Sequence, residues 1–222
     1  LVCATIVCQL SVANAFITPF GQRVDDSISR GLDYLRSIQG NDGGWGGATG
    51  LAALCFLEQR VSADWNAPSR GYVGMEPEDQ ERIRNSMKYC IDNIGGFGNG
   101  ARANAYQAGA CLMGMSLYIG TGGPIDVGAG RSVVDGIRAG IDSLKNAQGN
   151  CGTNQGGWHY IDSSSGICDG DLSTTQFGMA GLSAAAAVFP DADMTLPNVS
   201  VFLGHATNND GGNKYRPSGY PS

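Results

Sequence analysis

The sequence predicts an all-α protein, a partial α/α toroid (an incomplete α/α barrel) of helical hairpins, with an open α-solenoid as the related alternative. Three observations lead to this prediction. Four segments of similar pattern recur about every 55 residues along the chain. Each of the first three is followed by a Gly-rich turn and then by a second segment rich in Ala and Gly. Strand-like alternation of apolar and polar residues is absent over any useful length.

Residues 1–15 are predicted to be a secretory signal peptide that has lost its Met and its basic start. The apolar stretch from Leu1 to Val12 is too short to span a bilayer. Ala13 and Ala15 supply the small residues of a cleavage site, which would start the mature chain near Phe16. The alternative is a buried N-terminal helix. Export would make the protein secreted or periplasmic, in an oxidising compartment.

Residues 16–222 are predicted to form the toroid domain, with three complete hairpins and the start of a fourth. The first helices contain the segments "RGLDYLRSIQ" from Arg30, "SMKYCIDNIG" from Ser86, "RAGIDSLKNAQ" from Arg138 and "NVSVFLGHAT" from Asn198. Tyr34, Tyr89, Ser143 and Phe202 fall into register in these segments. The first helix of the first hairpin is amphipathic. Its apolar residues at helical spacing are Ile28, Leu32, Leu35 and Ile38.

The second helices are predicted to start at Ala48, Ala103 and Ser173. Their segments "ATGLAALCFLEQ", "ANAYQAGACLMGMSLYI" and "LSTTQFGMAGLSAAAAVF" are apolar or small nearly all round, as expected for helices buried between neighbours. Polar links join the hairpins, and Pro77 and Pro197 suit the first turns of the helices that follow. Because the fourth hairpin lacks its second helix, we expect the domain to be incomplete at its C-terminus.

The composition excludes some partners. Only 15% of the residues are charged, the net charge is −6, and no cluster of Lys or Arg stands out. Nucleic acid and anionic membrane surfaces are therefore not expected as partners, and no transmembrane segment is predicted.

Seven cysteines are present, and two of them lie in the predicted signal peptide. Cys151 and Cys168 flank a Gly/Ser-rich loop and are the expected disulfide, which would stabilise the fold by about 3 kcal/mol on the chain-entropy estimate. Cys55, Cys90 and Cys111 fall in apolar helical patterns and are predicted to be core thiols, with one further pair among them left open.

The phrase "QGNDGGWGG" and the later "NQGGWHY" resemble the QW motif of the squalene cyclase and protein prenyltransferase superfamily. The first copy has the motif residues Arg30, Gly31, Tyr34, Leu35, Gln39, Gly43 and Trp45. The second copy has Arg138, Gly140, Leu144, Gln148, Gly156 and Trp158, with Ser143 for the aromatic residue. The two other repeats are degraded, with Ile94 and Thr207 in place of Gln. We expect the Gln and Trp residues to staple hairpins together by covering open helix ends.

The resemblance implies a possible acid catalyst. Class II terpenoid cyclases protonate their substrate with an Asp of a D-x-D-D-T motif. This chain has "CDGDLSTTQ" at the start of the second helix of the third predicted hairpin. Asp171 and Asp169 are therefore the candidate catalytic residues, but Leu172 stands where a further Asp is expected. The alternative, which the sequence favours, is that Asp171 or Ser173 caps the helix.

Other chemistry finds less support. A zinc enzyme of this superfamily needs Asp, Cys and His ligands, and neither His159 nor His205 has partners at ligand spacing. No metal site or cofactor is predicted, although zinc ligands could lie beyond Ser222. Thioester proteins with a similar toroid join a Cys to a Gln three residues on, whereas Gln155 is four residues after Cys151, so that chemistry is rejected.

The leading ends of the second helices are expected to converge on a concave pocket. Its predicted polar and aromatic lining is Tyr106, Gln107, Trp158, His159, Tyr160, Thr174 and Gln176, although these residues could equally pack the loops. The sequence favours an exported binding or scaffold module for a small apolar molecule or a peptide. The alternative is an enzyme, either a terpenoid cyclase or a zinc-dependent prenyltransferase-like protein whose key residues lie partly beyond Ser222. Isoprenoid processing is intracellular in this superfamily, so export disfavours the enzyme.

Overall fold

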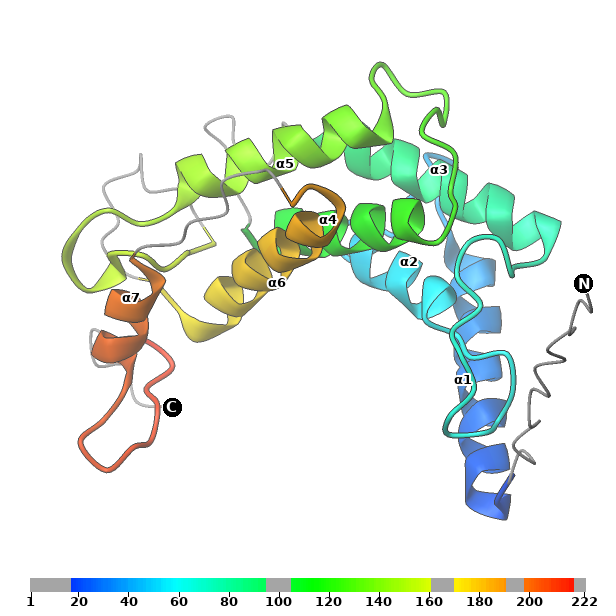
Figure 1. Cartoon of the computed structure of the whole chain (residues 1–222), viewed down its shortest axis with the longest axis horizontal. Helices are drawn as coiled ribbons and strands as arrows, with labels where there is room; N and C mark the ends of the chain where they lie inside the picture. The colour runs from blue at the N-terminus through cyan, green and yellow to red at the C-terminus, as the bar shows by residue number, and fades with distance from the viewer. Residues whose placement is uncertain (1–16, 95–104, 161–169, 191–197, 218–222) are drawn as a thin grey trace, which may run out of the picture.

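The computed structural model describes residues 17–94, 105–160, 170–190 and 198–217. Within these ranges the chain forms seven α-helices and one short 3₁₀-helix and has no β-strand, which confirms the all-α prediction. The predicted signal peptide, Asp169, Cys168 and Pro197 lie outside the described residues. The helices follow an open arc, with α1 at one end and α7 at the other (Figure 1).

The outer side of the arc carries α3 (Pro77–Ile94) and α5 (Val133–Ala147), which contact each other (Figure 1). Pro77 is the first residue of α3, as its position in the sequence predicted. The Ser132 side chain caps α5 by accepting a hydrogen bond from the Asp135 backbone N–H. Both outer helices therefore begin at residues suited to a helix start.

The inner side carries α2 (Thr49–Leu57), α4 (Ala105–Gly120) and α6 (Leu172–Val188), and α4 packs against both neighbours (Figure 1). These helices begin within two residues of the predicted starts. Glycine permits the close contacts: a Cβ on Gly50 would lie 2.2 Å from the Ala110 carbonyl carbon, and one on Gly109 would lie 2.1 Å from the Phe177 carbonyl oxygen. The small-residue pattern thus brings the backbones of the inner helices together.

The core lies between the inner and outer layers. Its fully buried side chains include Phe56, Leu57, Ile83, Met87, Ile91, Leu112, Met115 and Ile137. Cys90 and Cys111 are buried free thiols, as predicted. The prediction of a core position is wrong for Cys55, which is an exposed free thiol. Cys55 lies on the side of α2 away from the buried stripe that contains Ala52, Ala53 and Phe56.

The first helix, α1 (Pro19–Ile38), departs most from expectation. Among its four predicted apolar core positions only Leu32 is buried, while Ile28 and Ile38 are 44% and 47% exposed. The reason is that α1 stands at the end of the arc, so much of its apolar face has no described neighbour (Figure 1). At the other end, α7 (Val199–Ala206) buries Val199, Phe202 and Ala206.

Within the described ranges, no helix is both long enough and apolar enough to cross a membrane.

Candidate functional site

The first Gln/Trp turn links α1 to α3. The Gln39 amide donates hydrogen bonds to the carbonyl oxygens of Gly43 and Arg82 at 2.8 and 3.1 Å, and its own oxygen accepts one from Arg82 at 2.9 Å. The Trp45 indole N–H donates to the Leu35 carbonyl oxygen at 2.9 Å, which satisfies an acceptor near the end of α1. Both side chains therefore lie at the end of α1, and Gln39 also binds α3 of the next hairpin.

The second turn repeats this geometry. The Gln148 amide donates to the Gly156 carbonyl oxygen at 2.9 Å, and the indole of Trp158 donates to the Leu144 carbonyl oxygen at 2.8 Å. In both copies the acceptor for Trp lies four residues before the Gln. Trp158 is completely buried, so it belongs to the core and not to an open pocket surface.

Glycines let each turn dock on the outer helix of the following repeat. Gly43 and Gly156 have φ values of 83° and 90°, in the left-handed region that favours glycine. Added Cβ atoms would lie 2.5 Å from the Asn85 carbonyl oxygen and 1.8 Å from the Asn198 carbonyl oxygen, respectively. The next glycine in each copy likewise abuts a ring, that of Tyr89 or Phe202. The doubled phrase is therefore a repeated contact between neighbouring hairpins.

Asp171 lies at the start of α6 with no exposed surface. One carboxylate oxygen, Oδ1, accepts hydrogen bonds from the Thr174 backbone N–H and the Ser173 hydroxyl, both at 2.8 Å. This confirms the predicted helix cap. The other oxygen, Oδ2, is buried and has no hydrogen-bond partner within the structure described. A cap needs only one oxygen, so the second is available to another donor.

Two tyrosine hydroxyls converge on the same serine. The Ser173 hydroxyl lies 3.3 Å from that of Tyr160 and 3.0 Å from that of Tyr215. Its hydrogen bond to Ser173 lowers the pKa of Tyr215, but burial and the nearby charge of Asp171 outweigh this and raise that pKa above its usual value. The rings of His159 and Tyr160 meet edge to face at 6.2 Å. The cluster thus joins Tyr160 and His159 to Tyr215, which was not among the predicted pocket residues.

The other predicted pocket residues lie elsewhere on the inner helices. The Tyr106 ring contacts that of Phe177, with centroids 3.9 Å apart, between α4 and α6. Gln107 fills the space beside Gly47, where an added Cβ would lie 2.1 Å from its amide nitrogen. Thr174 is buried and donates to the Trp158 carbonyl oxygen at 2.8 Å, while Gln176 is exposed. Three of these side chains therefore pack at the helix starts, while Gln176 faces solvent.

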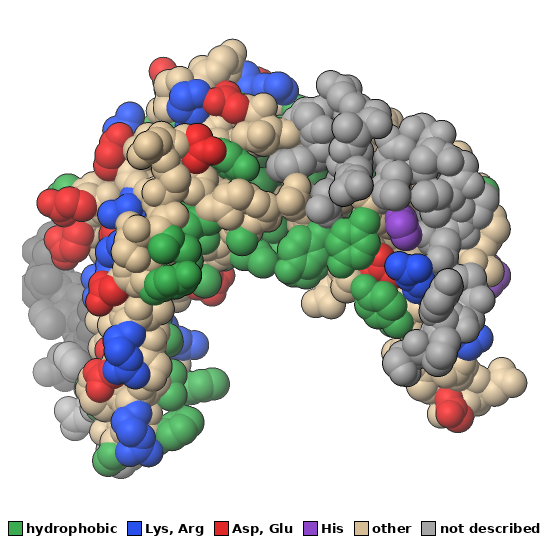
Figure 2. Space-filling view, turned by 180° about the vertical axis from the view of Figure 1, so that it is seen from behind, with side chains coloured by type: hydrophobic (Ala, Val, Ile, Leu, Met, Phe, Trp, Pro, Cys, Tyr) green, Lys and Arg blue, Asp and Glu red, His purple; other side chains and the backbone are tan. Residues whose placement is uncertain are grey.

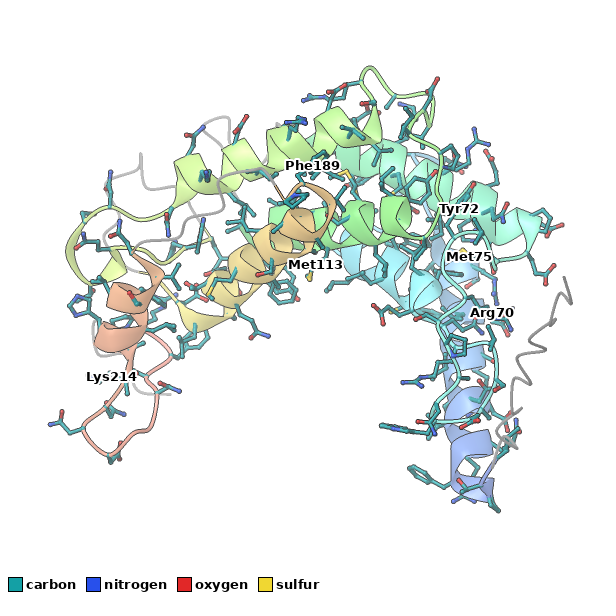
Figure 3. All side chains as sticks on the ribbon, viewed as in Figure 1. Arg70, Tyr72, Met75, Met113, Phe189 and Lys214 are labelled. Carbon is teal, nitrogen blue, oxygen red and sulfur yellow. The ribbon has the colours of Figure 1, made fainter. Side chains whose placement is uncertain are left out.

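A groove of about 440 Å³ lies near the opposite ends of the inner helices. Its lining residues are Leu54 and Glu58 at the end of α2, Met113, Ser116, Leu117, Gly120 and Thr121 in and after α4, and Ala180, Ala184, Ala187 and Val188 in α6. Met113 is on the concave side of the arc (Figure 3), along which hydrophobic side chains gather (Figure 2). The volume lies within the range of small-molecule sites.

The groove combines apolar walls with one unsatisfied hydroxyl. Ser116 is 4% exposed, and its Oγ has no hydrogen-bond partner within the described part of the chain. A buried polar group without a partner destabilises the fold, so this hydroxyl is an exception among buried polar groups. Sequence reasoning missed the groove. The available signal was the spacing of Ala180, Ala184 and Ala187, which puts small side chains on one face of α6.

A second hollow of about 270 Å³ runs along α1. Its apolar walls include Phe20, Val24, Ile28 and Ala63, with Trp65 at 83% exposure. The Arg60 guanidinium lies 5.4 Å from the centre of the Trp65 ring and donates to the Trp65 carbonyl oxygen.

Across the residues that the structure describes, no three His, Cys, Asp or Glu side chains gather as a metal site would require. Cys151 is disulfide-bonded, but its expected partner Cys168 lies outside the described residues, so the pairing stays a prediction. No family model, curated protein or solved structure matches the chain.

Proposed function

We propose that the chain is an exported binding module, part of an α/α toroid, that holds a small apolar molecule or a peptide on its concave face. The toroid is supported by inner and outer helices that alternate along an arc, and by two Gln/Trp turns whose glycines lie against the first helix of the following hairpin in the same way. Export rests on the sequence of residues 1–15 alone.

The observation that carries the binding function is the groove between α2, α4 and α6. Its walls are alanine, leucine, methionine and valine side chains, and its one buried hydroxyl, on Ser116, lacks a partner within the described residues. Ligand sites in proteins share this composition of apolar walls with few polar groups. A scaffold without a ligand would gain stability by filling the groove and removing the hydroxyl.

The neutral dye N-phenyl-1-naphthylamine tests this function, because its fluorescence rises in apolar sites. We expect saturable binding to the full chain, and we expect Ala184→Leu and Ala187→Leu to weaken it at least about fivefold by filling the groove. Ala187 is exposed, so that variant keeps its fold if the other does not. Asn146→Leu adds the same side chain at an exposed position on α5 and is the control. Absent binding, or equal effects of all three variants, contradicts the proposed function.

The second candidate is an enzyme, and Asp171 is the observation in its favour. A fully buried carboxyl group with one unpartnered oxygen could donate a proton to an alkene or epoxide. Asn can replace Asp as a helix cap, so Asp171→Asn should keep the fold while abolishing any cyclisation of squalene. Conversion that survives this substitution, or no conversion by the unaltered chain, rules out the cyclase. Stoichiometric zinc in the purified protein would instead support a prenyltransferase-like enzyme.

A further inference from the structure

The groove has a negative electrostatic character. Glu58 is exposed and is the one charged residue that lines it within the described residues. None of the salt bridges between described residues engages Glu58. Glu58 directly follows Leu57, the last residue of α2. The C-terminal end of a helix carries a partial negative charge, which adds to the charge of the carboxylate.

Two further helices end at the same groove. Gly120 is the last residue of α4, and Val188 is the last residue of α6, and both line the groove. The guanidinium of Arg138 lies 4.7 Å from the centre of the Phe189 ring, immediately after α6. The C-terminal ends of all three helices contribute to a field that favours a cation.

The polar side chain that the groove offers to a ligand accepts hydrogen bonds. The Thr121 hydroxyl already donates to the Leu117 carbonyl oxygen at 2.7 Å and accepts from the Tyr72 backbone N–H at 3.0 Å. The Ser116 Oγ is closed to solvent, so the exposed Glu58 carboxylate is the side-chain polar group that a ligand can reach among the described lining residues. A primary ammonium group donates three hydrogen bonds and accepts none, so it complements a carboxylate, which only accepts.

We propose that the groove binds a small amphiphile with a primary ammonium group, whose alkyl chain lies against Leu54, Met113 and Ala184. The ammonium group lies at Glu58 and the end of α2. This inference rests on the binding function proposed above and adds the class of ligand to it. An anionic amphiphile is disfavoured because the same charges repel it.

Competition for the bound N-phenyl-1-naphthylamine tests the class of ligand. Decylammonium, decanol and decanoate share one chain length and differ in the charge of the head group, and each is used below its micelle concentration. We expect decylammonium to displace the dye at a concentration about fivefold lower than decanol, and decanoate to be weaker than decanol. Added salt should reduce the preference, because the head group is close to solvent.

Matched carboxylate variants locate the charge. Glu58→Gln should reduce the preference for decylammonium over decanol to about twofold or less. Glu78→Gln removes an equal charge from an exposed position in the first turn of α3 and should leave the preference unchanged. Equal effects of the two variants would show attraction to the net charge of the whole chain and would overturn the inference.

The outcomes for the two proposals are separable. If the dye binds and Ala187→Leu blocks it, but the three head groups compete equally, the ammonium inference fails and the binding function stands. If the dye does not bind in the groove, the binding function itself fails.

Discussion

Replacement of Trp158 by Ala tests whether the second Gln/Trp turn stabilises the fold. Trp158 has no exposed surface, and its indole donates to the Leu144 carbonyl oxygen at 2.8 Å. A buried Trp→Ala substitution costs about 3–5 kcal/mol. The hydrogen bond contributes about 0.5–1.5 kcal/mol, and its loss leaves a buried acceptor near the end of α5. We therefore expect the free energy of unfolding to fall by about 4–5 kcal/mol.

The three tryptophans of the chain provide an internal scale. Trp45 makes the equivalent hydrogen bond but is only partly buried, and Trp65 is 83% exposed. Thermal unfolding is followed by circular dichroism at the helix band with the disulfide intact. The loss of stability should be largest for Trp158→Ala, smaller for Trp45→Ala and smallest for Trp65→Ala. The first should lower Tm by about 8–20 °C for a chain of this size, and the last by little. A Trp158→Ala loss no larger than that of Trp65→Ala would refute the stapling role.

Three further predictions concern single residues. Burial raises the pKa of Asp79, but hydrogen bonds and charge from Arg36 and a second arginine outweigh it, so this pKa lies below its usual 3.8. Stability from the ionised carboxylate is thus present above pH 3.8 and lost as the pH falls through the lower folded-state pKa. Urea titrations at several pH values should show this loss, which Asp79→Asn should abolish while costing about 1–2 kcal/mol near pH 7. Gly156→Ala should lower the free energy of unfolding, measured by chemical denaturation, by at least about 3 kcal/mol, because its Cβ would lie 1.8 Å from a backbone oxygen. Gly211 also has a left-handed φ but has open space around it, so Gly211→Ala should lower this free energy by about 1–2 kcal/mol. Equal losses in the two variants would contradict the docking contact. Ser116→Ala should raise the free energy of unfolding by about 1 kcal/mol, since it removes an unpartnered buried hydroxyl, and a loss of stability would mean that the hydroxyl is satisfied.

Much of the helical pattern could be predicted because it depends on local signals. Pro77 opens α3 at the predicted residue, because proline lacks the N–H that the first turn leaves unpaired. Asp171 caps α6, as the residue type and position indicated. Gln39 and Gln148 were expected to bind open backbone groups, and both donate to the carbonyl oxygen of the first glycine in the Gly-Gly-Trp sequence. Each of these contacts joins residues that lie close together in the sequence.

Contacts between distant segments were not predictable in the same way. Ile28 and Ile38 have the spacing of core residues, but α1 lies at the end of the arc and leaves them exposed. Periodicity identifies a face that can be buried and does not say which segment covers it. Tyr215 reaches Ser173 from a distant part of the chain, and no motif connects the two residues. Trp158 was predicted both as a staple and as pocket lining, and its burial supports only the first role.

The groove follows from where the glycines stand along the inner helices. Gly50 and Gly109 lie near the starts of α2 and α4, and each brings its helix to within backbone contact of the next. Helices pack at an angle, so a pair that touches near one end diverges toward the other. At the far ends the side chains of α6 are Ala184 and Ala187, too small to fill the widening space. Larger residues there would have closed the core, so glycines allow tight packing near the helix starts, while alanines leave a ligand-sized hollow where three helices end.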